Sequence, residues 1–433
     1  MGAAAGQRWT PTAALFRAAA VAVVALVLAV LLRRPDLLYL AAPLLLGTAA
    51  GLLRRPSSDP VARFVVSEDV PLEGAELTAD VQVDAPGTDV VSIAVPSAGW
   101  VRPPKGRTGV YAVRPAADGT AAMSVPLIAA RWGRHQVGPV RATFTAQDGL
   151  LRWGPVELPA RTVRVLPLTD RFDGASDVPQ ASGAVGVHRS PRPGEGSELS
   201  GVRVYVPGDR LRRINWKVSL RADQLHVNAT VAERDAEVVL LLDGRYDAGQ
   251  SGGVDGQASG IDATVRATAA LARFYLQLGD RVGLLAQGER MTSLRAGGGR
   301  RQLTRLLDAL LDVRPPLIVG ADPELVDPPG LDPRALVVLL SPLVGTAVYD
   351  RAAALRRMGH PLVVVDTLPA EATPPGESEW TALALRLWRL QRDTRTHRLA
   401  ELGVPVVAWG GAGSLDAVLR DLARAGSAPR ARR

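Results

Sequence analysis

The segment from residue 196 to residue 228, GSELSGVRVYVPGDRLRRINWKVSLRADQLHVN, gathers side chains that could do chemistry. Asp209 lies among several arginines, and Trp216 and Lys217 follow it closely. A carboxylate surrounded by guanidinium groups can act as an acid or base, bind an anionic ligand together with them, or pair with them internally. The residue types alone leave these three roles open, so the elements around the segment must decide between them.

The local pattern favours a structural role for this segment. The letters VPGD predict a turn that ends at Asp209, whose carboxylate can accept hydrogen bonds from backbone or arginine donors. Arg213 and Trp216 share one face if the following residues are helical. We therefore predict a clasp in which Asp209 pairs with Arg203 or Arg213 and Trp216 seals the edge of a core. A ligand or partner site remains the alternative.

A second candidate carboxylate ends a strand. The run AEVVLLLDG, residues 236–244, is continuous and rich in Val and Leu, which is typical of a buried parallel strand. Asp243 stands at its carboxyl end. Ligands of open α/β sheets bind outside the carboxyl ends of the strands, so Asp243 is the natural candidate at that edge.

The elements that must position these residues differ along the chain. The middle alternates apolar and polar residues with period two between frequent Gly and Pro, which predicts an antiparallel β-sandwich. The C-terminal half alternates apolar strands with amphipathic helices, which predicts a doubly wound α/β sheet. The predicted organisation is an N-terminal tail and helix pair (1–56), the sandwich (57–168), a linker and signature segment (169–235), the α/β domain (236–427) and a basic tail (428–433).

The N-terminal region predicts a membrane anchor. Residues 14–32 and 37–53 are apolar apart from Arg17, and each reaches the length range of a bilayer-spanning helix. The linker RRPD between them is short, so we predict a transmembrane hairpin with two spans in the cell membrane. The arginines beside the soluble part favour a cytoplasmic location for it. A signal peptide followed by a core helix is the alternative.

Composition narrows the function classes. The chain has 433 residues, enough for two or three domains, and a net charge of +8. Its basic residues are almost all arginine and are scattered, so we predict no nucleic-acid binding. The absence of cysteine excludes disulfides, thiolate metal sites and cysteine nucleophiles.

Two further signals carry little weight. The letters GQSGG at residues 249–253 match a nucleophile elbow, but they lie in a predicted loop rather than between a strand and a helix. Trp380 and Trp388 share roughly one face of a predicted helix, and we expect both to pack in the core; an exposed patch that binds a partner is the alternative.

The opening segment resembles a family signature. VRVYVPGDRLRRINW, then SLRADQLHVN, then ERDAEVVLLLD is similar to the signature of the domain of unknown function 58 family. RWGRHQVGPV and DGLLRW resemble the stretch before it. The resemblance implies a membrane hairpin, a β-rich region and a von Willebrand factor A-like domain, and a MoxR-type AAA+ ATPase as partner. The signature positions are Arg203, Tyr205, Gly208, Asp209, Arg213, Asn215, Trp216, Ser219 and Arg221.

The chain departs from the family pattern in two places. Asn215 stands where the family usually has aspartate, which argues against a role that needs charge there. A-type domains bind Mg²⁺ through Asp-x-Ser-x-Ser, whereas this loop has Asp243, Arg245 and Asp247 at those positions. Asp243 and Asp247 could hold a cation together with waters, but Arg245 already supplies positive charge. We expect a metal-free A-type scaffold without a cofactor.

These observations favour a non-enzymatic, membrane-anchored scaffold that binds a partner through loops at the sheet edge, including Asp243. The resemblance implies that the partner is a MoxR-type ATPase and that the pair acts in the assembly or maturation of membrane or envelope complexes. One alternative is a hydrolase that acts on an anionic substrate through Asp209, Asp243 and the signature arginines. The other is an envelope structural or adhesion protein, which requires the soluble part to lie outside the cell.

Overall fold

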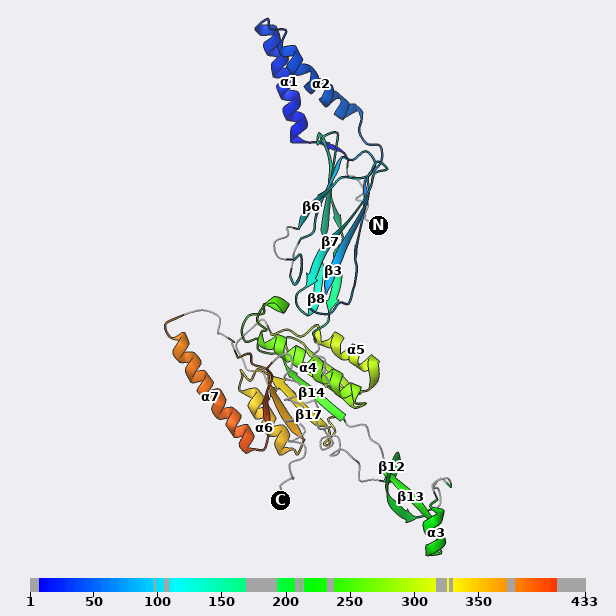
Figure 1. Cartoon of the computed structure of the whole chain (residues 1–433). Helices are drawn as coiled ribbons and strands as arrows, with labels where there is room; N and C mark the ends of the chain where they lie inside the picture. Colours follow the sequence, from blue (N-terminus) through cyan, green and yellow to red (C-terminus); the bar gives the residue numbers. More distant parts are fainter. Residues whose placement is uncertain are drawn as a thin grey trace. The chain divides into compact units, whose positions relative to one another are not determined.

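The computed structural model divides the chain into two units, Met1–Leu166 and Pro167–Arg433 (Figure 1). The residues that it describes are 8–96, 99–104, 109–168, 193–206, 211, 214–231, 237–316, 325–326, 330–370, 372 and 378–410. The mixture of an apolar N-terminal region and several sheets agrees with the prediction of a multidomain α and β protein.

The first unit contains two apolar helices, α1 (Ala13–Leu31) and α2 (Leu37–Leu53). Helix α1 is long and apolar enough to cross a membrane, with a mean hydropathy of 2.6, and α2 is a shorter apolar helix. The two helices lie side by side (Figure 1). The buried positions of α1 are Leu15, Ala22 and Ala29, which are seven residues apart and therefore form one seam. Small residues in such a seam let two helix backbones approach closely.

The described residues just before α1 pair with the sheet of this unit. Strand β1 (Thr10–Pro11) pairs antiparallel with β10 (Leu151–Leu158). Trp9 is buried against Trp153, with 5.8 Å between their ring centroids. The N-terminal segment is therefore a part of the β-sheet unit, and α1 starts directly from it.

Two antiparallel sheets share one core in this unit. Their orders are β1-β10-β9-β4-β6 and β2-β3-β7-β5, with β11 and β8 as a separate pair. Alternate residues point inward, as in β2, where Ala62, Phe64 and Val66 are buried. The remaining strands are β2 (Val61–Val66), β3 (Glu76–Asp84), β4 (Val90–Ala94), β5 (Val101–Arg102), β6 (Val110–Val113), β7 (Thr120–Ala129), β8 (Gly133–Val137), β9 (Val140–Ala146) and β11 (Arg161–Val165).

The second unit begins with the family-signature residues. Strand β12 (Pro193–Val204) pairs antiparallel with β13 (His226–Val231), and helix α3 (Trp216–Ala222) lies between them in the chain. We call β12, α3 and β13 together the signature hairpin. Part of the segment predicted as a linker is therefore strand.

The rest of the second unit is a six-stranded sheet of order β16-β15-β14-β17-β18-β19 with helices around it. Every strand pair is parallel except β15 with β16. One core cluster joins alternate residues of β14 to α6 and α7. The end of the predicted α/β domain, after residue 410, and the predicted basic tail lie outside the described residues. The elements are β14 (Glu237–Asp243), a 3-10 turn (Gly253–Asp255), α4 (Gly260–Gln277), β15 (Arg281–Gln287), β16 (Met291–Gly297), α5 (Gly299–Leu310), β17 (Leu336–Ser341), α6 (Ala347–Arg357), β18 (Leu362–Asp366), α7 (Thr381–Glu401) and β19 (Val406–Ala408).

Candidate functional site

The carboxyl edge of this sheet is built around a buried ion pair. Strand β14 ends at Asp243, and the chain turns so that Arg245 folds back onto it. The Arg245 Nε donates to Asp243 Oδ1 at 2.8 Å, and its Nη2 donates to Oδ2 at 3.1 Å. The two side chains are 3% and 0% exposed. A bidentate pair of this kind satisfies both carboxylate oxygens with a planar cation.

The neighbouring strand completes the arrangement. Ser341, the last residue of β17, donates its hydroxyl to Asp243 Oδ2 at 2.8 Å and accepts from the Leu343 backbone N–H at 3.0 Å. Tyr349 donates to the Leu343 carbonyl at 3.2 Å. Burial raises the pKa of the Tyr349 hydroxyl, so this group remains a protonated donor at neutral pH. The hydrogen bonds therefore run from β14 through β17 to α6.

This geometry does not fit a divalent cation. Mg²⁺ needs several oxygen ligands in near-octahedral geometry, whereas Arg245 binds both oxygens of Asp243. Asp247 instead accepts the backbone N–H of Ile261 at 3.0 Å, at the start of α4. Within the described part of the chain, no group of three His, Asp or Glu side chains could hold a metal ion. Arg245 stands where a metal would otherwise neutralise Asp243.

The burial of Asp243 also argues against the hydrolase alternative. That hypothesis requires Asp243 to face a solvent-open cleft together with Asp209, but Asp243 is fully buried. A carboxylate that is held by an internal guanidinium and a serine hydroxyl cannot reach a substrate. The other proposed member, Asp209, lies outside the described residues.

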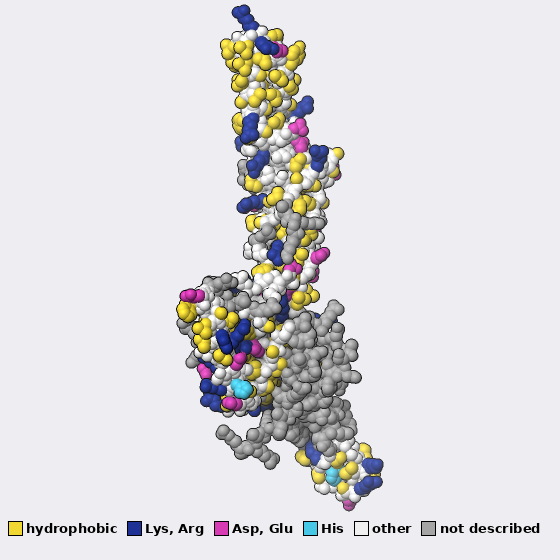
Figure 2. Space-filling model, turned by 60° about the vertical axis from the view of Figure 1, so that its left-hand side comes forward, with side chains coloured by type: hydrophobic (Ala, Val, Ile, Leu, Met, Phe, Trp, Pro, Cys, Tyr) yellow, Lys and Arg dark blue, Asp and Glu magenta, His cyan; other side chains and the backbone are white. Residues whose placement is uncertain are grey.

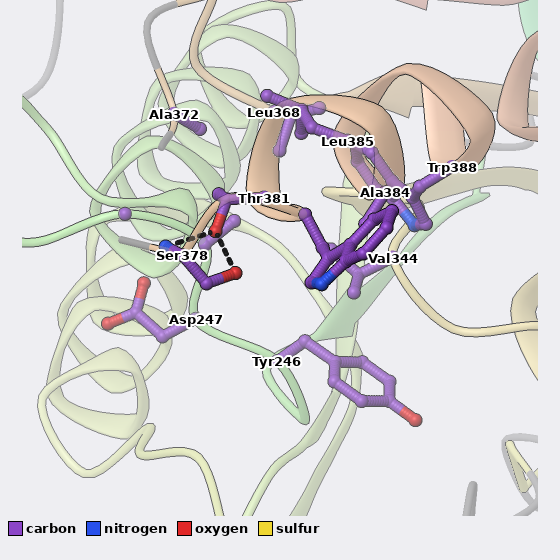
Figure 3. A pocket seen from close by; sticks show the side chains of 13 residues that line it. Tyr246, Asp247, Val344, Leu368, Ala372, Ser378, Thr381, Ala384, Leu385 and Trp388 are labelled. Atoms are coloured by element: carbon purple, nitrogen blue, oxygen red, sulfur yellow. Dashed lines mark hydrogen bonds between the residues drawn. The ribbon is translucent and has the colours of Figure 1, made fainter. Parts of the chain in front are cut away.

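An apolar cavity of about 460 Å³ lies beside the ion pair, between the loop after β14 and helix α7 (Figure 3). Its walls include Tyr246, Val344, Leu368 and Trp388. Arg392 of α7 forms an ion pair with Asp366 at 2.5 Å and lies over the ring of Trp388, one of the lining residues. Trp380 also lines it, yet this side chain is 66% exposed, so the prediction that both tryptophans pack in the core is wrong for Trp380.

In the signature hairpin, Asn215 has a structural role. Its Oδ1 accepts the Val218 N–H at 3.2 Å and caps α3, while its Nδ2 donates to Asn228 Oδ1 at 2.8 Å. A carboxylate could cap the helix but could not donate to Asn228. Asn215 therefore makes both contacts as a neutral side chain, and neither contact needs a charge at this position.

Ser219 and Tyr205 also tie the signature hairpin together. The Ser219 hydroxyl donates to the Asn215 carbonyl at 2.8 Å and accepts the His226 N–H at 2.8 Å, which joins α3 to β13. The Tyr205 backbone N–H donates to the Leu225 carbonyl at 2.8 Å. The local fold therefore accounts for the Ser219 hydroxyl, whereas at Tyr205 it uses only the backbone.

The expected clasp is only partly described. Trp216 is 62% exposed, so within the described chain it does not seal the edge of a core as predicted. Arg203 donates to the Val204 carbonyl at 3.1 Å, and Arg221 is exposed in the last turn of α3. Gly208, Asp209 and Arg213 lie outside the described residues, so the pairing of Asp209 with an arginine stays a prediction.

Sequence reasoning missed the apolar surface of the signature hairpin. Trp216 and Leu220 are one helical turn apart on α3 and are 62% and 83% exposed. Leu211, Leu225 and Val206 are exposed as well. The spacing of Trp216 and Leu220 was a readable signal, but spacing alone does not tell whether an apolar face meets a core or solvent. Trp216 and Leu220 thus form an exposed apolar face on α3, and exposed apolar patches mark interaction surfaces.

Sequence comparison places part of this unit in a family. Residues 201–379 match the family described as Protein of unknown function DUF58. Curated relatives include Uncharacterized protein Mb1516 of Mycobacterium bovis and Uncharacterized proteins MT1527 and Rv1480 of two strains of Mycobacterium tuberculosis. Each is 30% identical over 222 residues, which is 48% of this chain and 65% of the relative. The match thus spans less than two thirds of the relatives' own length, and their names describe no activity.

Proposed function

Given that the chain belongs to the DUF58 family, whose function is unknown, we propose that it is a membrane-anchored interaction protein that binds a protein partner and catalyses no reaction itself. One observation carries this proposal. The carboxylate at the sheet edge is closed off by Arg245, whereas the apolar side chains of the signature hairpin are open to solvent. Exposed aromatic and leucine side chains are typical anchors of a protein interface.

The two N-terminal helices support the anchor. Their outward side chains are large and apolar, including Val30 at 77%, Leu46 at 71% and Leu53 at 85% exposure. Water would make such a surface costly, while lipid makes it favourable. We propose that α1 and α2 form a hairpin with two spans, and that the positive-inside rule places the soluble part in the cytoplasm.

The first unit is built to hold such a hairpin at both ends. Thr12, just before α1, donates its hydroxyl to the Gly149 carbonyl at 2.7 Å and its N–H to the Leu150 carbonyl at 2.9 Å. Gln147, in the same loop, donates to the carbonyl of Arg54 just after α2 at 3.0 Å. The entry and exit of the helix pair therefore meet one loop of the sheet unit, as a hairpin anchor requires.

The proposed partner is a MoxR-type AAA+ ATPase, and this identity rests on the family resemblance alone. The six-stranded sheet alternates strands and helices, as a von Willebrand factor A-like domain does. We propose that this part of the chain is such a domain. Partner recognition would combine the signature hairpin with loops at the carboxyl edge of that sheet. The envelope-protein alternative needs the soluble part outside the cell, opposite to the proposed orientation.

A binding measurement tests this function. The detergent-purified full chain is immobilised and exposed to the purified MoxR-type ATPase of the same organism, with and without nucleotide. The double variant Trp216→Ala and Leu220→Ala should weaken binding by about 10- to 100-fold, because truncating an interface anchor costs about 1–2 kcal/mol or more. The control is Leu278→Ala with Met291→Ala, which removes apolar side chains of similar exposure from the α/β part.

The two variants give distinct outcomes. Loss in the α3 variant alone supports the proposal. Equal loss in both variants indicates non-specific adhesion, and no binding by the native chain in either nucleotide state rules out this partner.

A further inference from the structure

Five exposed arginines come together at the amino edge of the six-stranded sheet, from β15, β16 and the first two turns of α5. Strand β16 is antiparallel to β15, so it ends beside the first residues of β15, and α5 begins there. This edge is opposite the one where Asp243 lies, because Asp243 pairs with Gln287 at the other end of β15. We call the five side chains the arginine patch, and they are Arg281, Arg295, Arg300, Arg301 and Arg305.

Hydrogen bonds to the backbone hold the three elements of the arginine patch together. The Arg281 Nη2 donates to the carbonyl of Ala296, the residue after Arg295, at 2.9 Å. The buried Gln302 side chain donates to the carbonyls of Val282 and Arg295 at 2.8 and 2.9 Å, which ties α5 to both strands. The arginines therefore belong to one surface of the folded domain, although 24 positions separate the first from the last along the chain.

The exposed charge of this surface has one sign. None of the five arginines forms an ion pair with another described residue. Two carboxylates lie at the same edge, but Asp280 is buried and Glu237 is partly buried. Like charges that lack counter-charges repel one another, so an anionic partner would stabilise the patch.

The exposed acidic groups nearby lie outside the patch. Along the chain, Asp308 and Asp312 follow Arg305 by about one and two helical turns, toward the other end of α5. Beyond β14, the same edge of the sheet carries Asp332 and Arg334 before β17, and their charges cancel. The positive surface is thus confined to β15, β16 and the start of α5.

The start of α5 is arranged against the usual rule for helix ends. Its N-cap, Gly298, offers no side-chain cap, and the first turn holds no acidic residue. The N-terminus of a helix carries a partial positive charge, so Arg300 and Arg301 in this turn are unfavourably placed. Helix α4 shows the usual arrangement, with a capping box of Ser259 and Asp262. Places where a sequence breaks a local rule are expected at functional surfaces.

The surroundings of the patch favour a lipid surface over other anionic partners. A Cβ atom at Gly298 or Gly299 would meet nothing within 4 Å, so the backbone between the arginines is open to an approaching surface. The three elements contain no aromatic residue on which nucleic-acid bases could stack. The chain also carries its own proposed bilayer anchor, the helix pair whose hydrophobic side chains are seen at the top of Figure 2.

We propose that the α/β domain docks on the anionic headgroups of its own membrane through the arginine patch. This docking rests on the membrane anchor and the cytoplasmic side of the proposed function, since anchoring raises the effective concentration of the domain at that surface. Each arginine near an anionic leaflet strengthens such binding by about five-fold. Docking by the amino edge leaves the carboxyl edge, with Arg245 and the apolar cavity, free to meet a protein partner.

Lipid quenching in nanodiscs tests the docking with the full chain. Because the chain has no cysteine, Thr304→Cys puts a single bimane label among the arginines of α5, and the discs contain a phosphatidylcholine with a nitroxide headgroup as quencher. We expect strong quenching when phosphatidylglycerol is added, weak quenching in phosphatidylcholine alone, and a several-fold decrease at high salt. The same label at Gln250→Cys, in the exposed loop after β14 at the opposite edge, should be quenched little in every disc.

Removing charge from the patch gives the second measurement. The combined variant Arg300→Gln, Arg301→Gln and Arg305→Gln should weaken docking by about 100-fold and lower the quenching to its value in phosphatidylcholine alone. Hydrogen exchange of α5 peptides checks that the helix stays folded in this variant. A loss of quenching with unchanged exchange assigns the effect to the charges and not to the fold.

A matched control removes the same net charge elsewhere. Arg290→Gln, Arg314→Gln and Arg386→Gln together change three exposed arginines that lie nearer the carboxyl edge. This variant should keep the quenching of the native chain, because it leaves the arginine patch intact. Equal loss in both combined variants would show that only the total charge matters, and would overturn the proposal.

The remaining outcomes also decide the proposal. Quenching at position 304 that needs both anionic lipid and the α5 arginines supports it. Equal quenching in both kinds of disc contradicts it, and so does no quenching in anionic discs, which would leave an acidic protein as the partner of the patch. A chain that does not stay with the discs would refute the anchor and the docking together. Failure of the docking alone leaves the ATPase measurement in detergent unaffected.

Discussion

Replacing Arg245 with alanine should lower the free energy of unfolding of the α/β domain by about 3–5 kcal/mol, the usual cost of breaking a buried ion pair. The variant leaves the Asp243 carboxylate with the Ser341 hydroxyl and the backbone N–H of residue 245 as partners, in a buried site. Urea denaturation of the detergent-purified chain measures the loss. Hydrogen exchange of peptides from β14 and β17 assigns it to this domain.

Two variants control this experiment. Arg141→Ala breaks the pair between Arg141 and Glu157, whose side chains are 61% and 56% exposed, and should cost about 1 kcal/mol or less. Arg245→Met with Asp243→Asn removes both charges together and should recover much of the stability lost in Arg245→Ala. If Arg245→Ala lowers the free energy of unfolding no more than Arg141→Ala does, the ion pair does not stabilise the sheet edge.

Replacing Trp9 with alanine should destabilise the sheet unit by about 3–5 kcal/mol, the range for truncating a buried tryptophan. Trp9 is only 7% exposed and contacts Trp153, although it comes from a segment that precedes the first helix. Hydrogen exchange of β9 and β10 peptides in the full chain checks this, because β1 pairs directly with β10. Unchanged protection in the variant would show that the N-terminal segment is not part of the core.

The matched variant is Trp9→Phe. The Trp9 indole N–H is buried and has no hydrogen-bond partner in the described structure. Phenylalanine keeps most of the ring packing and removes this unsatisfied donor, whose burial costs about 1–3 kcal/mol. We therefore expect Trp9→Phe to stay close to the native stability. A loss as large as that of Trp9→Ala would mean that the indole N–H has a partner.

Long periodic segments made the broad fold predictable. Residues 238–242, just before Asp243, are all apolar, and the structure makes them part of a central strand with parallel neighbours on both sides. Strand β2 shows the period of two that the sequence indicated. In both cases burial follows from a local pattern, and local patterns can be read from one sequence.

Features that depend on distant partners could not be read in this way. Strand β1 has only two residues, one of them proline, and exists because Arg152 lies opposite Thr10. Similarly, the Ser341 hydroxyl reaches Asp243 from 98 residues away along the chain. The sequence indicated that Arg245 brings positive charge near Asp243, but not that it is buried. These contacts are set by tertiary packing, which overrides weak local propensity.

Helix α7 and the signature hairpin show the same limit for surfaces. The spacing of Trp380 and Trp388 predicted a shared apolar face, but only Trp388 packs toward the domain while Trp380 remains mostly exposed. Trp216 likewise has the spacing of a core residue and is exposed. Periodicity identifies which residues share a face. It does not identify what covers that face, and function depends on what covers it.

The central claim is that the Arg245 guanidinium neutralises Asp243 at the carboxyl edge of the sheet. This edge therefore serves as a binding scaffold and not as a metal site or a reaction site. Calorimetric titration of Mg²⁺ into the detergent-purified native chain and into Arg245→Ser tests it most directly. We predict no saturable binding to the native chain. The variant frees Asp243 beside Ser341 and adds a hydroxyl, so it should bind Mg²⁺ in the millimolar range. One-site binding of Mg²⁺ to the native chain that Asp243→Asn abolishes would contradict the claim.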